Sequence, residues 1–486
     1  MPFCSLSLLA AGQMPSMGWI APFVIILVCI ATLPLIPRTS HWWEHNRNKL
    51  ILGLILGLAT LLHYQSRGFG TMLHDATLVK AMHHLGLEVE EHHDEHGGVH
   101  HVSAAGAAAL VGAMGNAFFE YVPFIVLLFS LYSISGGIAV RGDIPAHPLT
   151  NTIILGIGGV LASFVGTTGA SMLLIRPLLH TNSERKRVAH TVIFFIFIVS
   201  NIGGCLLPIG DPPLFLGYLR GVPFLWTLGL WKEWAFMLIV LLCVYYAWDT
   251  WAYRHERPLD LVRDETQVQR IQLGGKINLL WLLLVVLAVA LLDPAKPVPG
   301  TDWTPPPFLR EGIQLLLVGL SFLTTPGGLR SENKFNFHAI AEVACLFIGI
   351  FITMQVPIEI LNLRGAELGL SKPWQFFWAT GTLSSFLDNA PTYVVFFQTA
   401  NSLTHAAGEG ITPLLDGNFI RQDLLVAISL GAVFMGANTY IGNGPNFMVK
   451  SIAEQSGVKM PSFFGYMIYS VGILVPLFII VTLLFI

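Results

Sequence analysis

A long apolar stretch with a polar break at its centre decides the fold: residues 373–400 read PWQFFWATGTLSSFLDNAPTYVVFFQTA. A membrane-spanning helix needs about 20 mostly apolar residues, so this run is long enough to cross the hydrocarbon core. At its centre, Asp388-Asn389-Ala390-Pro391 interrupts the run with a carboxylate, an amide and a proline. Non-helical backbone at membrane depth is tolerated only inside protein or beside a water-filled cavity. The break therefore predicts a re-entrant hairpin whose tip belongs to a site.

The composition of the whole chain predicts an all-α polytopic membrane protein. Of 486 residues, 54% are hydrophobic and 11% are charged, whereas a soluble domain has about 25% charged residues. The net charge is −3 and the basic residues form no continuous patch, which argues against nucleic-acid binding. The five cysteines include no CxxC pair, so neither a disulfide framework nor a zinc site is indicated.

The same length criterion divides the chain into a series of candidate spans. They are 19–36, 50–64, 118–140, 149–180, 188–219, 233–253, 277–293, 309–325, 337–361, 373–400, 422–450 and 460–486. Three more of these are interrupted: 149–180 by Gly166-Thr167-Thr168-Gly169, 188–219 by Pro208-Ile209-Gly210-Asp211-Pro212-Pro213, and 422–450 by Gly442-Asn443-Gly444-Pro445-Asn446. The N-terminal segment Met1–Gln13 lacks a basic n-region, so span 19–36 is expected to be a retained helix and not a cleaved signal.

The positive charges predict an orientation in the membrane. If 149–180 and 373–400 are hairpins and the N-terminus lies outside, 17 of the 26 Lys and Arg residues fall on one face and 9 on the other. The positive-inside rule makes the richer face cytoplasmic. The expected location is a bacterial-type inner (plasma) membrane.

The order of the predicted elements indicates an inverted repeat. Residues 1–253 and 277–486 each read as three helices, a hairpin, a broken helix and a final helix, joined by a polar cytoplasmic linker at 254–276. Ser163-Phe164-Val165-Gly166-Thr167-Thr168 matches Ser385-Phe386-Leu387-Asp388-Asn389-Ala390 at the tips, and Ser200-Asn201-Ile202-Gly203 is matched with Ala437-Asn438-Thr439-Tyr440 in the broken helices. Inverted repeats with discontinuous helices are the architecture of secondary transporters.

At these residues the sequence resembles the ion transporter superfamily, specifically its sodium/proton antiporter (NhaD-type) branch and the neighbouring citrate-transporter-like proteins. Residues 384–391 (SSFLDNAP) and 208–213 (PIGDPP) carry the resemblance, which extends over most of the chain from about Phe118. It implies secondary active transport and a homodimer. In the dicarboxylate branch each hairpin tip typically carries a Ser-Asn-Thr triplet, and neither tip here does. This departure argues against a carboxylate substrate.

Two carboxylates at the breaks are the expected ion carriers, and Asp388 is the stronger candidate because Asn389, Ser384 and Ser385 lie beside it. An acid in hydrocarbon costs at least ~2.5–3.5 kcal/mol, so Asp388 and Asp211 each need a partner or a function. The alternative for Asp211 is that it only caps the half-helix that follows. Neutral amide and hydroxyl oxygens nearby would add cation ligands without adding buried charge. The predicted ion- and proton-binding set is Asp211, Asp388, Asn389, Ser384, Ser385, Asn201, Thr167, Thr168, Asn438, Thr439, Asn443 and Asn446.

The sign of this charge favours a cation as the transported species. A fixed negative group repels an anion by about 4 kcal/mol at about 4 Å and an effective dielectric of 20. We therefore expect Na⁺/H⁺ antiport by alternating access, with a cation-coupled citrate or dicarboxylate transporter as the alternative. Glu120 and Glu342 are candidate proton-pathway residues. A membrane-embedded enzyme is disfavoured because no span carries an HExxH motif. No cofactor is expected besides Na⁺ or another monovalent cation as the transported ion.

The loop at 65–102 is rich in histidine and acid. Its histidines include His92, His93 and His96, which are a weak metal-binding possibility. Because the ligand spacing is irregular, a solvated and partly disordered loop on the non-cytoplasmic face is the stronger expectation.

Overall fold

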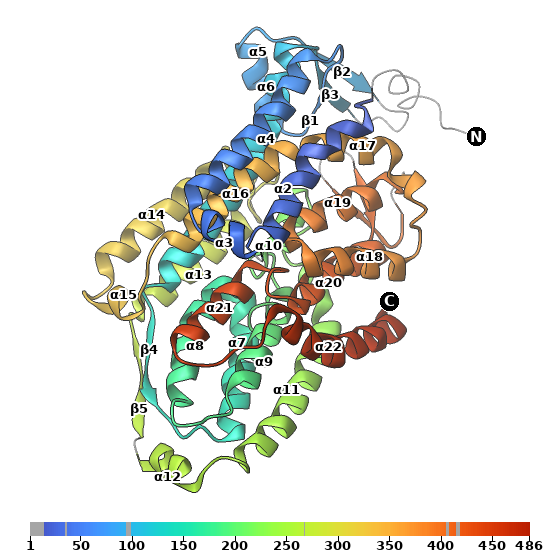
Figure 1. The fold of residues 1–486 in the computed structure, drawn as a ribbon. Helices are drawn as coiled ribbons and strands as arrows, with labels where there is room; N and C mark the ends of the chain where they lie inside the picture. The colour runs from blue at the N-terminus through green and yellow to red at the C-terminus, as the bar shows by residue number, and fades with distance from the viewer. Residues whose placement is uncertain (1–13, 35, 94–98, 267, 405–407, 415–417) are drawn as a thin grey trace.

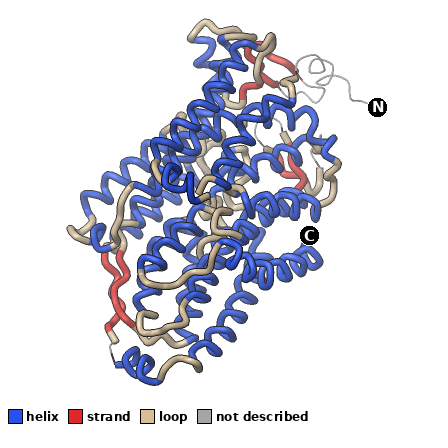
Figure 2. Tube along the Cα trace, in the orientation of Figure 1, coloured by secondary structure: helices blue, strands red, loops and turns tan. Residues whose placement is uncertain are grey.

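The computed structural model describes residues 14–486 except 35, 94–98, 267, 405–407 and 415–417. The prediction made for Met1–Gln13 lies outside these residues. The described chain is mostly helical, with small antiparallel sheets at its periphery (Figures 1 and 2). Within it, five single helices are long and apolar enough to cross a membrane, and up to seven spans result if each of two bent helix pairs counts as one. The prediction of an all-α polytopic membrane protein is confirmed.

One group of helices packs around α4 and α6. It comprises η1 (Met17–Ile20), α2 (Ala21–Thr32), α3 (Pro37–Trp43), α4 (Asn46–Ser66), α6 (Ala107–Ser135), α13 (Ile277–Leu291), α14 (Leu309–Thr324), α15 (Leu329–Glu332), α16 (His338–Thr353) and α17 (Gln355–Arg364). The closest approach is between α4 and α16, where a Cβ on Gly349 would lie 2.5 Å from the Cα of Gly53. Small residues at such a crossing let the two backbones touch. This group contains elements from both halves of the sequence.

A second group of helices holds all four predicted breaks. It comprises α7 (Pro148–Val165), α8 (Thr167–Thr181), α9 (Ala189–Ile198), η2 (Ile202–Cys205), α10 (Pro212–Leu219), η3 (Trp226–Leu230), α11 (Trp231–Tyr253), η4 (Gly365–Leu368), α18 (Pro373–Phe386), α19 (Asn389–Ser402), α20 (Gln422–Met435), η6 (Gly436–Asn438), α21 (Gly444–Gln455) and α22 (Phe463–Phe485). The helices on either side of each tip pack against each other, α7 on α8 and α18 on α19. The polar interruptions in the sequence therefore coincide with real helix ends.

Gly166 forms the first hairpin tip because of its backbone conformation. Its φ of 78° and ψ of 149° lie in a region that is essentially restricted to glycine. Val165 ends α7 and Thr167 begins α8 on either side of it. The second tip turns differently, at Leu387 and Asp388, which both have negative φ.

Replacing Gly166 by Ala is expected to lower the free energy of unfolding by about 1–3 kcal/mol, because a Cβ strains this conformation. Chemical denaturation of the purified protein in detergent measures the change. Gly444→Ala is the control, since Gly444 starts α21 without a positive φ and a Cβ there would meet no atom within 4 Å. Equal effects of the two substitutions would contradict a conformational requirement at Gly166.

The described part of the histidine-rich loop contains regular secondary structure, while residues 94–98 lie outside the described residues. β1 (Met72–Leu73), β3 (Val99–Ser103) and β2 (Val89–His93) form an antiparallel sheet in the order β1-β3-β2, and α5 (Ala76–His84) packs beside it. Figure 1 shows this unit capping one end of α4 and α6. Its side chains are polar, but Leu73, Leu78, Val79 and Met82 form a small apolar core with Ala108. That core explains why the segment folds.

Two further strand pairs complete the structure. β4 (Ala139–Asp143) pairs with β5 (Gln269–Gly274), and β6 (Ile411–Pro413) pairs with β7 (Phe419–Arg421). β5 and α12 (Pro258–Thr266) lie within the predicted 254–276 linker, so the described part of that linker contains a strand and a helix. Figure 2 shows the β4–β5 ribbon running along one side of the molecule.

Candidate functional site

The two hairpin tips and the two broken helices meet at one carboxylate. Asp211, which is 1% exposed, precedes α10 in the first broken helix. Its Oδ1 accepts hydrogen bonds from Thr167 Oγ1 at 2.9 Å and from Asn443 Nδ2 at 3.0 Å. Its Oδ2 accepts from Asn389 Nδ2 at 2.6 Å. Each donor comes from a different break, and two of the three donors lie in the second half of the sequence.

All the described groups that donate to the Asp211 carboxylate are neutral. Its donors are one hydroxyl and two amides. Among the described residues no Lys, Arg or His forms an ion pair with it, although such pairs occur elsewhere in the helices. A buried carboxylate without a counter-charge is costly, so this arrangement favours a bound cation or a bound proton.

Local sequence explains why the Asp211 side chain is available. Gly210 precedes it, and Pro212 and Pro213 begin α10, so this turn has few backbone N–H groups to satisfy. Asp211 occupies the N-cap position of α10, but its side chain makes no capping hydrogen bond. The side chain instead contacts residues of the other three breaks. The alternative that Asp211 only caps α10 therefore does not describe this side chain.

Asp388 makes the capping contact that Asp211 lacks. It is half-buried, and its Oδ1 accepts from the N–H of Ala390 at 3.0 Å at the start of α19. Its neighbour Asn389 is the residue that reaches Asp211. The second tip thus brings both an amide donor and a second carboxylate to this region.

A chain of amides links the two broken helices behind Asp211. Asn443 Nδ2 also lies 3.0 Å from the Ser200 carbonyl and 3.3 Å from Asn201 Oδ1. Asn201 Nδ2 donates to Asn446 Oδ1 at 2.8 Å, and Asn446 Nδ2 donates to the carbonyl oxygens of Gly436 and Thr439. Asn201, Asn443 and Asn446 therefore hold the two breaks together, as a shared site requires.

Matched serines fasten each hairpin to its own broken helix. Ser163 Oγ donates to the carbonyl of Gly203 and accepts from the N–H of Leu206. Ser385 Oγ donates to the carbonyl of Met435 and accepts from Nδ2 of Asn438. Met435 and Asn438 therefore contact Ser385 in the way that Gly203 and Leu206 contact Ser163.

Two of the remaining predicted residues, Ser384 and Thr439, support the second tip. Ser384 Oγ donates to the Ala432 carbonyl at 2.7 Å, and Thr439 Oγ1 donates to the Ser385 carbonyl at 2.5 Å. Thr168 is half-buried in the first turn of α8. Two amide oxygens, Oδ1 of Asn389 and Oδ1 of Asn438, are buried and receive no hydrogen bond from the described residues. These unpaired oxygens are the kind of acceptor that a cation needs.

The two predicted pathway acids are both ion-paired. Arg220 Nη2, at the end of α10, lies 2.9 Å from both carboxylate oxygens of Glu120 in α6. Lys49 Nζ in α4 lies 2.5 Å from Glu342 Oε1 in α16. The first pair joins the two helix groups, while the second lies within one group.

The substitutions Glu120→Gln and Arg220→Gln are each expected to lower the free energy of unfolding by about 1–3 kcal/mol, because each leaves a half-buried charge unpaired. The double variant should lose no more than the worse single variant, and denaturation in detergent measures all three. Additive losses would contradict a direct pairing. A proton-pathway role instead requires that Glu120→Gln alone stops pH-driven transport.

The histidine candidates form no described metal centre. His96 lies outside the described residues, and the backbone of His92 and His93 pairs with His100 and Val99 across β2 and β3. In the described part of the chain no group of three or more His, Cys, Asp or Glu side chains is arranged to hold a metal ion.

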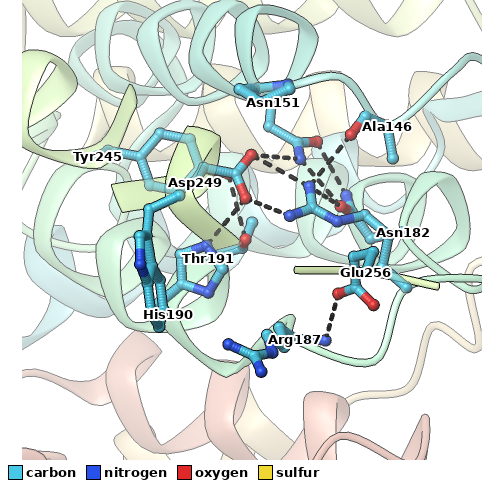
Figure 3. Close-up of polar contacts among 12 residues, drawn as sticks. Ala146, Asn151, Asn182, Arg187, His190, Thr191, Tyr245, Asp249 and Glu256 are labelled. Carbon is cyan, nitrogen blue, oxygen red and sulfur yellow. Dashed lines mark hydrogen bonds and ion pairs between the residues drawn. The ribbon is translucent and has the colours of Figure 1, made fainter. Parts of the chain in front are cut away.

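A second polar centre lies at the far ends of the same helices, and the sequence reasoning missed it. Asp249 in α11 is completely buried and accepts from Arg185 at 2.5 and 3.1 Å, from His190 Nε2 at 2.9 Å and from Asn151 Nδ2 at 3.2 Å (Figure 3). Asn151 and His190 lie in the first turns of α7 and α9, and Arg185 follows α8. The sequence contained one indication of this centre, because Asp249 is an acid four residues before the end of the apolar span predicted at 233–253.

Comparison with known proteins agrees with this architecture. Residues 97–486 match the family described as "Putative citrate transport". The chain belongs to this family. An uncharacterized transporter of Synechocystis sp. is 22% identical over 319 residues, which cover 63% of this chain and 70% of that protein. The chain is therefore a transporter of the citrate-transporter-like type and an integral membrane protein.

Proposed function

We propose that this transporter exchanges a monovalent cation, Na⁺ in the first instance, for protons by alternating access, with Asp211 as the group that both species occupy. The observation that carries the proposal is the buried Asp211 carboxylate, which receives three neutral hydrogen bonds and forms no ion pair with any residue that the structure describes. A proton or a cation removes its charge, and only one of them can do so fully at a time. Competition for one carboxylate couples the two fluxes.

The surrounding oxygens supply a plausible cation shell. Asn389 has its Nδ2 on Asp211 and its Oδ1 unpaired, so rotation of this amide would offer an oxygen to an entering ion. Asn438 Oδ1 is unpaired as well, and Asp388 lies beside Asn389. In transporters with discontinuous helices, unwound carbonyls and half-helix ends coordinate the coupling ion. We assign the other members of the predicted set to this shell or to its support.

The proposal includes the inverted-repeat organisation. We take 1–253 and 277–486 as the two repeats and 254–276 as the segment that joins them. The equivalent contacts of Ser163 and Ser385 support this division. So do the N-cap conformations of Asp211 (φ −144°, ψ 142°) and Asn443 (φ −150°, ψ 142°), which are nearly identical. An inverted repeat gives alternating access a structural basis, because exchange of the two repeat conformations opens the site to the opposite side.

The family description favours a second candidate, cation-coupled transport of citrate or a dicarboxylate. A carboxylate substrate about 4 Å from an ionised Asp211 would meet a repulsion of about 4 kcal/mol. A bound cation or proton at Asp211 would remove this repulsion, so the same residue would then serve as the coupling site. Both candidates require Asp211, and they differ in whether an anion must be present.

Reconstituted vesicles with an imposed pH gradient distinguish the two candidates. The purified protein is tested with Na⁺, Li⁺ or K⁺ chloride, and then with citrate. Antiport predicts that Na⁺ alone dissipates the gradient promptly. Gradient-driven citrate uptake, with no response when a cation is added in the absence of citrate, would overturn antiport and support the second candidate. Protein-free vesicles and vesicles with the Asp211→Asn variant report the background leak.

A further inference from the structure

A hollow at the junction of α3 and α4 has the chemistry of an anion site. It has a volume of about 320 Å³ and is lined by Arg38, His41, Trp42, His45, Arg47 and Asn48. Figure 1 shows α3 at the end of α4 opposite the β1–β3 sheet. The hollow is therefore remote from that sheet and is not lined by any residue that contacts Asp211.

Two arginines in the hollow have no counter-charge. Arg38 and Arg47 are exposed, and neither forms an ion pair with a carboxylate in the described part of the chain. The nearby acid, Glu44, lies 3.3 Å from His41. A guanidinium group binds phosphate through paired N–H donors, so two unpaired arginines beside one cavity favour a phosphate ligand.

The walls of the hollow are held in place by the protein. Asn48 Nδ2 donates to the Trp42 carbonyl at 2.7 Å, and the next residue of α3, Trp43, is buried. Lys49 Nζ lies 5.7 Å from the Trp43 ring and 2.5 Å from Glu342. Trp42 itself is exposed at the mouth of the hollow. The site is thus preformed around an exposed indole.

We propose that this hollow binds a phosphate group carried by an anionic membrane lipid. It lies where α4, a candidate membrane span, begins, and an exposed Trp is typical of the headgroup region. Arg38 and Arg47 belong to the face that the distribution of Lys and Arg predicts to be cytoplasmic, where anionic lipids gather. The ligand chemistry is a phosphate monoanion with an apolar tail directed into the bilayer.

Thermal unfolding of the purified full-length protein in detergent tests this proposal. The titrants are dioctanoyl phosphatidylglycerol, dioctanoyl phosphatidylcholine and inorganic phosphate, and the readout is the concentration that gives half the rise in unfolding temperature. Arg38→Gln/Arg47→Gln is the pocket variant. Arg257→Gln/Arg263→Gln is the matched control, because both arginines are exposed and lie on the same predicted face. Removing two basic contacts should weaken phosphatidylglycerol binding about tenfold or more in the pocket variant alone.

Each result of this experiment has a defined meaning. Stabilisation by phosphatidylglycerol but not by phosphatidylcholine or inorganic phosphate, lost only in the pocket variant, supports the lipid site. Inorganic phosphate that matches phosphatidylglycerol at equal concentration overturns the lipid assignment in favour of free phosphate. Equal phosphatidylglycerol affinities in all three proteins overturn the site. Unliganded unfolding temperatures show whether both variants remain folded.

Discussion

Replacing Asp211 by Asn is expected to reduce cation-driven transport about 100-fold or more while leaving the protein folded. A cation that loses a carboxylate partner at about 4 Å loses about 4 kcal/mol, and each 1.4 kcal/mol is a factor of ten in affinity. Stability should change little, because two effects of the substitution offset each other. It removes a buried charge that has no counter-charge among the described residues, which stabilises the fold, and it disturbs the hydrogen bonds from the three donors, which destabilises it. Initial rates of gradient dissipation in vesicles, together with the unfolding temperature, measure both effects.

Asp388→Asn is the matched comparison for this prediction. It makes the same chemical change at the residue next to Asn389. Because Asn caps a helix as well as Asp does, the start of α19 should be preserved. Transport that survives Asp388→Asn but not Asp211→Asn assigns the carrier to Asp211. Loss in both variants extends the role to both acids. Normal transport in Asp211→Asn would remove the central residue of the proposal.

Moving the charge across the site gives a sharper test of the same idea. Asp211 and Asn443 occupy matching N-cap positions, and their side chains are 3.0 Å apart. The double variant Asp211→Asn/Asn443→Asp therefore keeps one carboxylate in the same shell. It should recover part of the transport that Asp211→Asn loses. No recovery, with both variants folded, would mean that the position of the charge matters as well as its presence.

The helix breaks could be predicted from the sequence because their causes are local. Gly166, Pro212 and Pro445 act on their own backbone, and the structure ends or begins a helix at each of them. The strands and the helix in the described part of the 65–102 segment could not be predicted in the same way. β2 is polar, and it becomes a strand because it pairs with β3 over a small core that α5 and α6 complete. Packing between segments that are distant in the sequence cannot be predicted from the composition of either segment.

The members of the site were easier to predict than their roles. Asp211, Asn389, Thr167 and Asn443 were singled out as polar residues at breaks, and the structure gathers them around one carboxylate. Sequence reasoning ranked Asp388 above Asp211, whereas in the structure Asp388 caps its own helix and Asp211 receives the three donors from the other breaks. Which side chain caps and which one reaches across depends on tertiary packing and cannot be deduced from the order of residues. Asp249 was missed because its partners are distant in sequence and it lies close to the predicted end of a span.

Replacing Asp249 by Asn is expected to lower the free energy of unfolding by about 3–5 kcal/mol, because the substitution leaves the guanidinium of Arg185 buried without a counter-charge. Asp249 also connects the start of α7, the loop after α8 and the start of α9, so its loss loosens the base of the hairpin that carries Thr167. Denaturation in detergent measures the stability, and transport by the surviving folded fraction should fall with it.

The exposed pair Arg141 and Glu332 provides the control for that prediction. Its Nη2–Oε2 distance, 2.5 Å, equals the shorter Arg185–Asp249 distance, but the side chains are 51% and 40% exposed instead of 1% and 0%. Hydrogen bonding to Arg141 lowers the pKa of Glu332, yet water screens this pair and solvates either partner alone. Glu332→Gln should therefore cost about 1 kcal/mol or less. Since the two pairs have the same shortest distance, equal costs would show that burial does not set the penalty. A large difference would show that Asp249 is needed because the guanidinium of Arg185 is buried and requires a counter-charge.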